Sequence, residues 1–236
     1  MTSEAGRMAI VTGGGTGLGQ AVARQLLNDG FEVLALGIDV EDEIDDPAHS
    51  FRHFDVTDRA AVARLADETD GLDALVNAAG IILHEGREFR NEGFAQVMDV
   101  NLRGTQEMCF SFQTALKARR GAVVNFASMW SIFGSGRNPA YSASKGAVES
   151  LTRALAVAWG GDGVRVNAVA PGWIETRMSV NAMTTPERAG PILARIPAGR
   201  WGKPSDVAAA VGFLVSPAAR YINGVTLPID GGYSVS

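Results

Sequence analysis

Cysteine is almost absent from this sequence of 236 residues. The single one, Cys109, excludes a disulfide within the chain and fits a reducing compartment, with Cys109 itself expected as a small buried residue. Long apolar runs are also missing, and Met1–Arg7 lacks the apolar core of a signal peptide. These absences predict a cytoplasmic protein that has no membrane partner.

Stretches of basic residues are missing as well. The formal net charge is −5 and no cluster of Lys and Arg favours nucleic acid, so a nucleic-acid partner is not expected. A bound metal is not expected either. Hydrophobic residues make up 46% and charged residues 20%, which is ordinary for a globular protein. A chain of this length suits one α/β domain with a sizeable core, which we assign to residues 1–236.

Strand-like and helix-like segments alternate along the chain without internal repeats. This alternation predicts a doubly wound parallel sheet of about seven strands with helices on both faces. Asp58 and Ser205 are typical of helix starts. The expected strands lie near 8–12, 31–36, 50–54, 72–76, 121–126, 163–169 and 224–229, and the expected helices near 17–29, 58–68, 88–118, 138–159 and 204–215.

Two segments depart from the alternation. Residues 37–50 are acidic, contain Pro47 and show no sustained apolar stripe, so we expect an irregular or one-turn crossover there. Residues 177–202 contain three prolines and three glycines between a strand and a helix, which favours a substrate lid over an ordinary long loop. We expect one short helix within Thr184–Pro197, with Pro186 in its first turn.

Tyr141 and Lys145 stand four residues apart in a segment expected to be helical, so they share one face. A free tyrosine has a pKa near ~10, and a nearby ammonium would lower the pKa of the Tyr141 phenol. Ser128 can donate a hydrogen bond to a carbonyl or alcohol oxygen. The three side chains predict an acid–base site that interconverts alcohols and ketones.

A glycine-rich turn follows the first strand, in the order strand, turn, helix, strand. Residues 12–19 read Thr-Gly-Gly-Gly-Thr-Gly-Leu-Gly. Glycines allow close approach to a pyrophosphate, which then meets free N–H groups at the start of the helix. This context predicts a dinucleotide site at Thr12, Gly13, Gly15, Thr16, Gly17, Leu18 and Gly19.

An ordered set of motifs extends this pattern. Thr12-Gly13-x-x-x-Gly17-x-Gly19, Asn77-Ala78-Ala79-Gly80, Asn101, Ser128, Tyr141-x-x-x-Lys145 and Pro171-Gly172 resemble the motif series of the short-chain dehydrogenase/reductase family, in order and rough spacing along nearly the whole chain. The resemblance implies one Rossmann-like domain, a nicotinamide cofactor and a homotetramer built through residues 88–118, 138–159 and the carboxyl-terminal strand.

The resemblance also implies roles for individual residues. Asn101 is expected as a fourth catalytic member whose backbone holds a proton-relaying water, or alternatively as a polar residue that kinks a helix. Lys145 would hold the nicotinamide ribose. Asp55 and Val56 would flank the adenine ring, Asn77, Ala78 and Gly80 would line the cofactor or tie strands together, and Pro171, Gly172, Ile174 and Thr176 would lie along the nicotinamide.

The second strand ends at Gly37, where NAD-specific relatives commonly carry an acidic residue. Asp39 can turn back toward the adenosine ribose hydroxyls. NADP would need Arg or Lys for its 2′-phosphate, and residues 37–51 contain neither, whereas six carboxylates lie between Asp39 and Asp46. Because those carboxylates repel a phosphate, we expect NAD, with NADP less favoured; a solvated acidic loop that never touches the cofactor stays open.

The substrate is the least determined part. Possible contacts are Met129, Trp130, Ser131, Ser135, Arg137, Asn138, His84, Trp173 and Met178. A small polar substrate such as a sugar, polyol or hydroxy acid is favoured. The alternatives are an NADPH-dependent β-ketoacyl thioester reductase and a cofactor-binding sensor that does no chemistry.

Overall fold

The computed structural model of the chain describes residues 6–236, so most of the Met1–Arg7 segment lies outside the described residues. Its centre is a parallel sheet of seven strands, as the sequence predicts, and the strands lie in the order β3-β2-β1-β4-β5-β6-β7. The strands are β1 Arg7–Thr12, β2 Phe31–Gly37, β3 His49–His53, β4 Ala74–Asn77, β5 Ala122–Phe126, β6 Arg165–Pro171 and β7 Thr226–Ile229.

The strand order reverses direction between β1 and β4. In an open parallel sheet, ligands bind beyond the carboxyl ends of the strands at such a point. The helices are α1 Gly17–Asn28, α2 Arg59–Asp67, α3 Asn91–Met98, α4 Thr105–Ser111, α5 Gln113–Arg119, α6 Trp130–Phe133, α7 Pro139–Trp159, α8 Val180–Thr184, α9 Pro186–Ala194 and α10 Pro204–Val215. Short 3₁₀ turns are η1 Arg87–Phe89, η3 Gly160–Asp162, η4 Pro217–Ala219 and η5 Tyr233–Val235.

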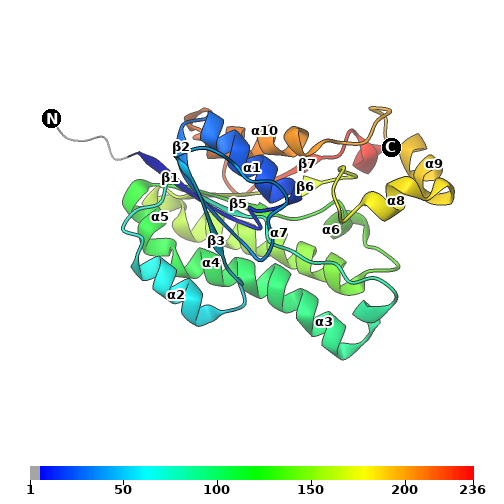
Figure 1. Ribbon diagram of the computed structural model, residues 1–236, viewed down its shortest axis with the longest axis horizontal. Coiled ribbons are helices and arrows are strands. Elements are labelled where there is room, and N and C mark those ends of the chain that lie inside the picture. The colour runs from blue at the N-terminus through cyan, green and yellow to red at the C-terminus, as the bar shows by residue number, and fades with distance from the viewer. Residues whose placement is uncertain (1–5) are drawn as a thin grey trace.

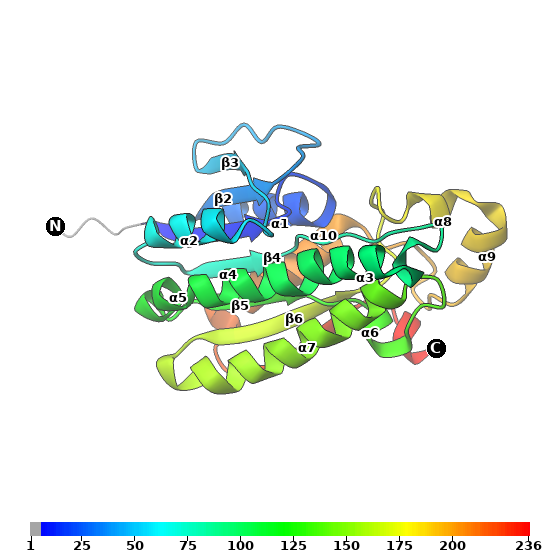
Figure 2. The same ribbon diagram turned by 90° about the horizontal axis from the view of Figure 1, so that it is seen from below.

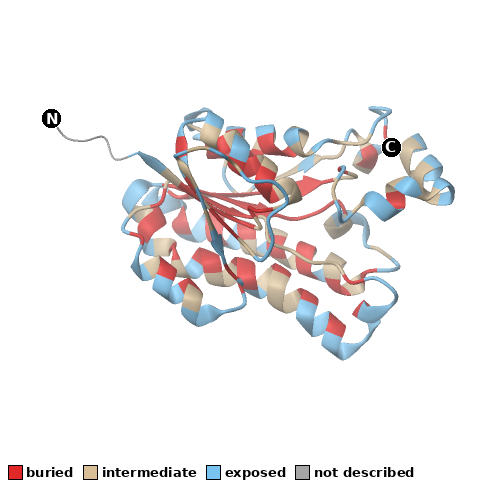
Figure 3. Cartoon of the chain, viewed as in Figure 1, coloured by how far each residue is buried: buried red, intermediate tan, exposed pale blue. Residues whose placement is uncertain are grey.

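Helices cover both faces of the sheet (Figure 1). One apolar layer lies between the sheet and the pair α1 and α10, and includes Val22, Leu26, Val207 and Val211. The other lies beneath α2, α4, α5 and α7, and includes Phe112, Leu116 and Trp159. The central strands β1, β4, β5 and β6 are therefore largely buried on both sides (Figure 3), which is why they read as mostly apolar runs, whereas the edge strands β3 and β7 are only partly covered.

The segment predicted as one helix over 88–118 is instead broken into several pieces. A π-helical stretch, Asp99–Gly104, joins α3 to α4, and η1 precedes α3. The Asn101 side chain accounts for the interruption, because it bonds to both backbone groups of Ile81 rather than facing solvent. Inserted side-chain contacts of this kind are a common cause of irregular helix geometry.

Both predicted helix starts are found, the second within one residue of Ser205. The Asp58 carboxylate accepts from the Ala61 N–H at 3.0 Å and caps α2. The last long helix begins at Pro204 rather than Ser205, and the Asp206 carboxylate accepts from the Lys203 N–H at 2.7 Å. Proline suits the first helical position because the N–H that it lacks has no partner there.

The crossover from β2 to β3 contains no helix, as predicted, and forms an open loop at one edge of the sheet (Figure 2). Residues 177–202 form two short helices, α8 and α9, which project beside the carboxyl terminus (Figure 1). Pro186 begins α9 as expected, whereas α8 was not expected.

Within residues 6–236, no helix combines the length and apolarity that crossing a bilayer requires, and no metal-binding cluster of His, Cys, Asp and Glu occurs.

Arginines gather at the amino ends of the strands, opposite the predicted site. Helices in this fold end there, and their last carbonyls attract cations. Arg7 donates to the Asp29 carbonyl at the end of α1, and Arg165 donates to the Leu214 carbonyl at 2.7 Å at the end of α10. These basic side chains therefore have a structural role.

Candidate functional site

The tertiary structure brings Ser128, Tyr141 and Lys145 to one cleft, as predicted. Tyr141 and Lys145 lie one turn apart on α7, and Ser128 follows β5. The Lys145 Nζ lies 5.6 Å from the centre of the Tyr141 ring and donates to the Phe126 carbonyl at 2.6 Å. A lysine buried in this way cannot swing into solvent, so its ammonium stays beside the phenol.

Burial controls the ionisation of both groups. It raises the pKa of Tyr141 to about 12, against a smaller lowering by the Ser128 hydroxyl and a further small raising by Glu88. Burial lowers the pKa of Lys145 to about 8. The expected lowering of the Tyr141 pKa by Lys145 is not found: the pKa is raised, because removing the phenolate from water costs more free energy than the Ser128 hydrogen bond recovers.

Asn101 lies fully buried next to this group. Its amide donates to Ser144 on α7 at 3.1 Å and exchanges two hydrogen bonds with the Ile81 backbone. It therefore joins α7, the π-helical stretch and the 78–83 loop. The helix-kinking role proposed as its alternative is present; the water relay stays a prediction.

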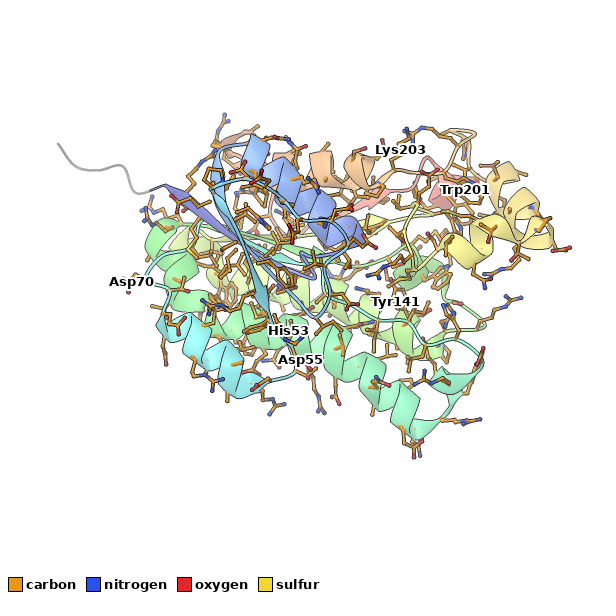
Figure 4. All side chains as sticks on the ribbon, viewed as in Figure 1. His53, Asp55, Asp70, Tyr141, Trp201 and Lys203 are labelled. Atoms are coloured by element: carbon orange, nitrogen blue, oxygen red, sulfur yellow. The ribbon has the colours of Figure 1, made fainter. Side chains whose placement is uncertain are left out.

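The cleft has a volume of about 940 Å³ and opens at the carboxyl ends of the strands. Tyr141 lies on the side of the molecule toward α8 and α9, whereas Asp70 marks the far end (Figure 4). The predicted residues that line the cleft are Leu18, Ala78, Gly80, Ser128, Tyr141, Lys145, Pro171, Gly172, Ile174 and Thr176.

The glycine-rich turn lies beside the cleft, next to Thr176. Gly13 has φ +66°, which a side chain would strain, and a Cβ on Gly15 would overlap the Asp39 carbonyl. The Gly17 N–H begins α1 and donates to the Glu41 carboxylate at 2.7 Å, while the Glu41 N–H donates to the Gly15 carbonyl at 2.8 Å. A carboxylate already bound at this helix start shows that the turn accepts an anion.

Glu41, rather than Asp39, is thus the acidic residue at the turn. The Glu41 side chain is 28% exposed and contacts the Arg177 guanidinium at 2.6 Å. The Asp39 side chain is 66% exposed and lies 3.9 Å from Arg177. The sequence drew attention to this acidic loop, but nothing in it singled out Glu41, because the loop conformation decides which carboxylate meets the N–H.

The other predicted cofactor residues lie outside the cleft. Thr12 accepts from the Ala79 N–H at 3.1 Å, and Asn77 donates to Asn125 at 2.9 Å, which confirms that it ties β4 to β5. The exposed Asp55 accepts from Thr57, and Val56 packs against Gly104. Gly13, Gly15, Thr16, Gly17 and Gly19 form the turn itself, which the loop carrying Asp39 and Glu41 crosses.

The substrate end of the cleft has aromatic walls. Trp130 meets Tyr141 and Trp173 edge to face, with ring centres 5.7 and 5.8 Å apart. Asn138 is buried, and its amide donates to the Leu83 carbonyl and to Glu88, so this amide is not free to bind substrate. His84 and Arg137 line the cleft as exposed side chains, and Arg188 and Asn181, which the sequence did not point to, join them from the segment 177–202.

Comparisons with known proteins agree with this geometry. Residues 13–234 match a family model described as enoyl-(acyl carrier protein) reductase. The chain is 40% identical to galactitol 2-dehydrogenase (L-tagatose-forming) of Cereibacter sphaeroides, over 98% of this chain and 96% of the relative. It is 36% identical to 2-dehydro-3-deoxy-D-gluconate 5-dehydrogenase of Escherichia coli, over 97% and 95%.

A solved structure is similar at 42% identity. It is a putative NAD(P)-dependent gluconate 5-dehydrogenase from Beutenbergia cavernae with bound NADP at low occupancy. Its TM-score is 0.90, and the match covers 99% of each chain. Both the sheet order and the arrangement of helices therefore have a solved counterpart.

Proposed function

The chain belongs to the short-chain dehydrogenase/reductase family and is an NAD(P)-dependent alcohol dehydrogenase or ketone reductase, and we propose that it acts on a sugar-derived polyol or hydroxy acid through Ser128, Tyr141 and Lys145. The observation that carries this proposal is the convergence of a half-buried phenol, a buried ammonium and a hydroxyl in one cleft beside an anion-binding helix start.

The bound nicotinamide supplies the acceptor or donor of a hydride. Ser128 holds the substrate oxygen, and Tyr141 moves the proton at that oxygen. Because the phenol has its pKa raised to about 12, it is protonated at neutral pH and suited to donate to a ketone. In the opposite direction it must be ionised, so alcohol oxidation should accelerate as the pH rises.

The cofactor fits the residues that surround the glycine-rich turn. The Gly17 N–H would meet the pyrophosphate where it now meets the Glu41 carboxylate. Pro171, Gly172, Ile174 and Thr176 would lie along the nicotinamide, and Lys145 would hold its ribose. We propose NAD over NADP because the crossover beside the turn carries Asp39 and Glu41, and these carboxylates would repel a further phosphate on the adenosine ribose.

The substrate proposal rests on the character of the cleft. Tryptophan faces pack well against the C–H groups of a sugar chain, and the polar groups of Ser135, His84, Arg137 and Arg188 can bond to hydroxyls or a carboxylate. The names of the similar proteins, a galactitol and a gluconate-derived dehydrogenase, support the same class.

A β-ketoacyl thioester reductase is the alternative; the description of the family model names a different reaction, enoyl reduction, but on a substrate held by an acyl carrier protein. Its acyl carrier would need a basic surface at the mouth of the cleft, whereas the main arginine group lies at the opposite end of the sheet. The test is a panel of galactitol, gluconate, a keto-sugar acid and an acetoacetyl thioester, each with NAD(H) and NADP(H). Turnover confined to the thioester would refute the sugar proposal, and tight cofactor binding without any turnover would support a sensor.

We also propose a cytoplasmic homotetramer. Apolar side chains stay exposed on α4 and α7, at Phe110 and Val157, and near the other expected interface, at Phe213 and Val225.

Residues 177–202 are proposed as the substrate lid, because Met178, Ala182 and Ile192 line the same cleft as Tyr141.

A further inference from the structure

Glu88 is a carboxylate that the mechanism above does not use, yet it lies against the catalytic helix. It belongs to η1, 53 residues before Tyr141, and its exposed fraction is only 1%. No ion pair with a cation is present for it among residues 6–236. A buried carboxylate without a cation is costly unless hydrogen bonds replace its water.

Three N–H groups supply those hydrogen bonds. Glu88 Oε1 accepts from the Leu83 N–H at 2.9 Å and from Asn138 Nδ2 at 3.2 Å, and Oε2 accepts from the Tyr141 N–H at 2.9 Å. All three partners donate and none accepts, which matches the acceptor-only character of a carboxylate.

The bond to Tyr141 replaces an ordinary helix cap. Asn138 precedes the first residue of α7, where its side chain would normally accept from the helix, but it makes no such bond. Its amide instead donates to Glu88 and to the Leu83 carbonyl. Glu88 thus reaches one of the free N–H groups at the positive end of α7, which is the N–H of the proposed catalytic tyrosine itself.

From this geometry we propose that Glu88 is a positioning residue, which caps α7 from a distant part of the chain and places a fixed negative charge beside Tyr141. The inference rests on the proposed role of Tyr141. Through Leu83 and Asn138, the same carboxylate anchors the loop that forms one wall of the cleft. It therefore fixes the position of the Tyr141 phenol relative to that wall.

The charge has a consequence for the proton transfer. A neighbouring carboxylate disfavours the phenolate, and Glu88 is one of the groups that raise the pKa of Tyr141. The other charged or titratable groups at the cleft are Lys145 on α7, Arg137 before it, His84 and Glu85 on the 81–86 loop, and Arg188 on the lid. The carboxylate in this set, Glu85, is exposed, whereas Glu88 is buried behind the cleft wall and bonded to the Tyr141 backbone.

Three variants test charge and position, which are read out separately by the pH profile and by kcat. Glu88→Gln removes the charge and, because one acceptor oxygen becomes an NH₂ group that faces an N–H donor, also at least one hydrogen bond. Glu88→Asp keeps the charge and shortens the reach, and Glu92→Gln removes an exposed charge at the start of α3 as a control. Rates of alcohol oxidation are measured between pH 6 and 10.5, with cofactor affinity by fluorescence titration and folding by thermal unfolding.

We expect the rate profile of Glu88→Gln to move to lower pH by a few tenths to about one unit. Glu88→Asp should keep the wild-type profile while kcat falls by roughly five- to fiftyfold, because the Tyr141 N–H loses its partner. Cofactor affinity should stay unchanged in all three, and Glu92→Gln should resemble the wild type.

A Glu88→Gln profile that coincides with that of Glu92→Gln would overturn the charge role, and an unchanged kcat in Glu88→Asp would overturn the positioning role. If Glu88→Gln does not fold, Glu88→Asp alone decides. Tyr141→Phe is measured in parallel: if that variant retains turnover, the proposed function fails, whereas its inactivity together with an unmoved Glu88→Gln profile refutes only the inference about Glu88.

Discussion

The contact between Glu41 and the glycine-rich turn makes a direct prediction about cofactor binding. The carboxylate sits on the Gly17 N–H, at the helix start where the pyrophosphate should bind. Cofactor must therefore displace it, and part of the binding free energy is spent in breaking that contact. Replacing Glu41 with Gln should tighten binding even though it removes an interaction from the free protein.

The size of the effect follows from the hydrogen bond that the cofactor has to break. A hydrogen bond to a charged group contributes about 1.5–3 kcal/mol and a neutral one about 0.5–1.5 kcal/mol. The amide in Glu41→Gln should therefore lower the free-energy cost of displacing residue 41 from the Gly17 N–H by on the order of 1–2 kcal/mol. The ion pair with Arg177 adds little, since that guanidinium is 63% exposed. The dissociation constant of NADH should fall roughly 5- to 30-fold, and that of NADPH should fall further because of its additional phosphate.

The assay is a fluorescence titration of each reduced cofactor without substrate at fixed ionic strength. Glu43→Gln is the matched control, because it removes a charge from the same loop but has an exposed side chain that makes no contact with the turn. The gain should shrink at high salt, where charges are screened. Equal affinities for the wild type and Glu41→Gln would refute the displacement, and weaker binding would mean that Glu41 helps to hold the cofactor.

Three further measurements test the site, the assembly and the lid. Tyr141→Phe should lower turnover by roughly 10²–10⁴-fold with cofactor affinity nearly unchanged, the usual range for general acid–base catalysis; near-normal turnover would remove Tyr141 from the mechanism. Light scattering should return a tetramer rather than the 24.8 kDa mass of one chain. Hydrogen exchange across residues 177–202 should slow when cofactor and a product analogue bind, if the proposed lid closes over them; strong protection in both states would show a permanently packed loop.

Local rules account for the parts that were predictable from sequence. The alternation of apolar runs and helical patterns determines a parallel sheet, since each strand must be buried on both faces. The spacing of Tyr141 and Lys145 determines that they share a helix face, and the glycines mark a turn that only they tolerate. The resemblance of the ordered motifs to one family was confirmed by relatives along the whole chain.

Contacts between distant segments decided the rest. The Asn101 side chain interrupts a helix because it meets Ile81, and Glu88 reaches α7 across 53 residues. The pKa of Tyr141 depends on burial, which the sequence near it does not reveal, so its direction was predicted wrongly. Which carboxylate of an acidic loop meets Gly17 depends on how the backbone crosses the turn, and a pattern of residue types carries no information about that path. Sequence thus determined the chemistry present, while tertiary packing determined which groups meet and in what protonation state.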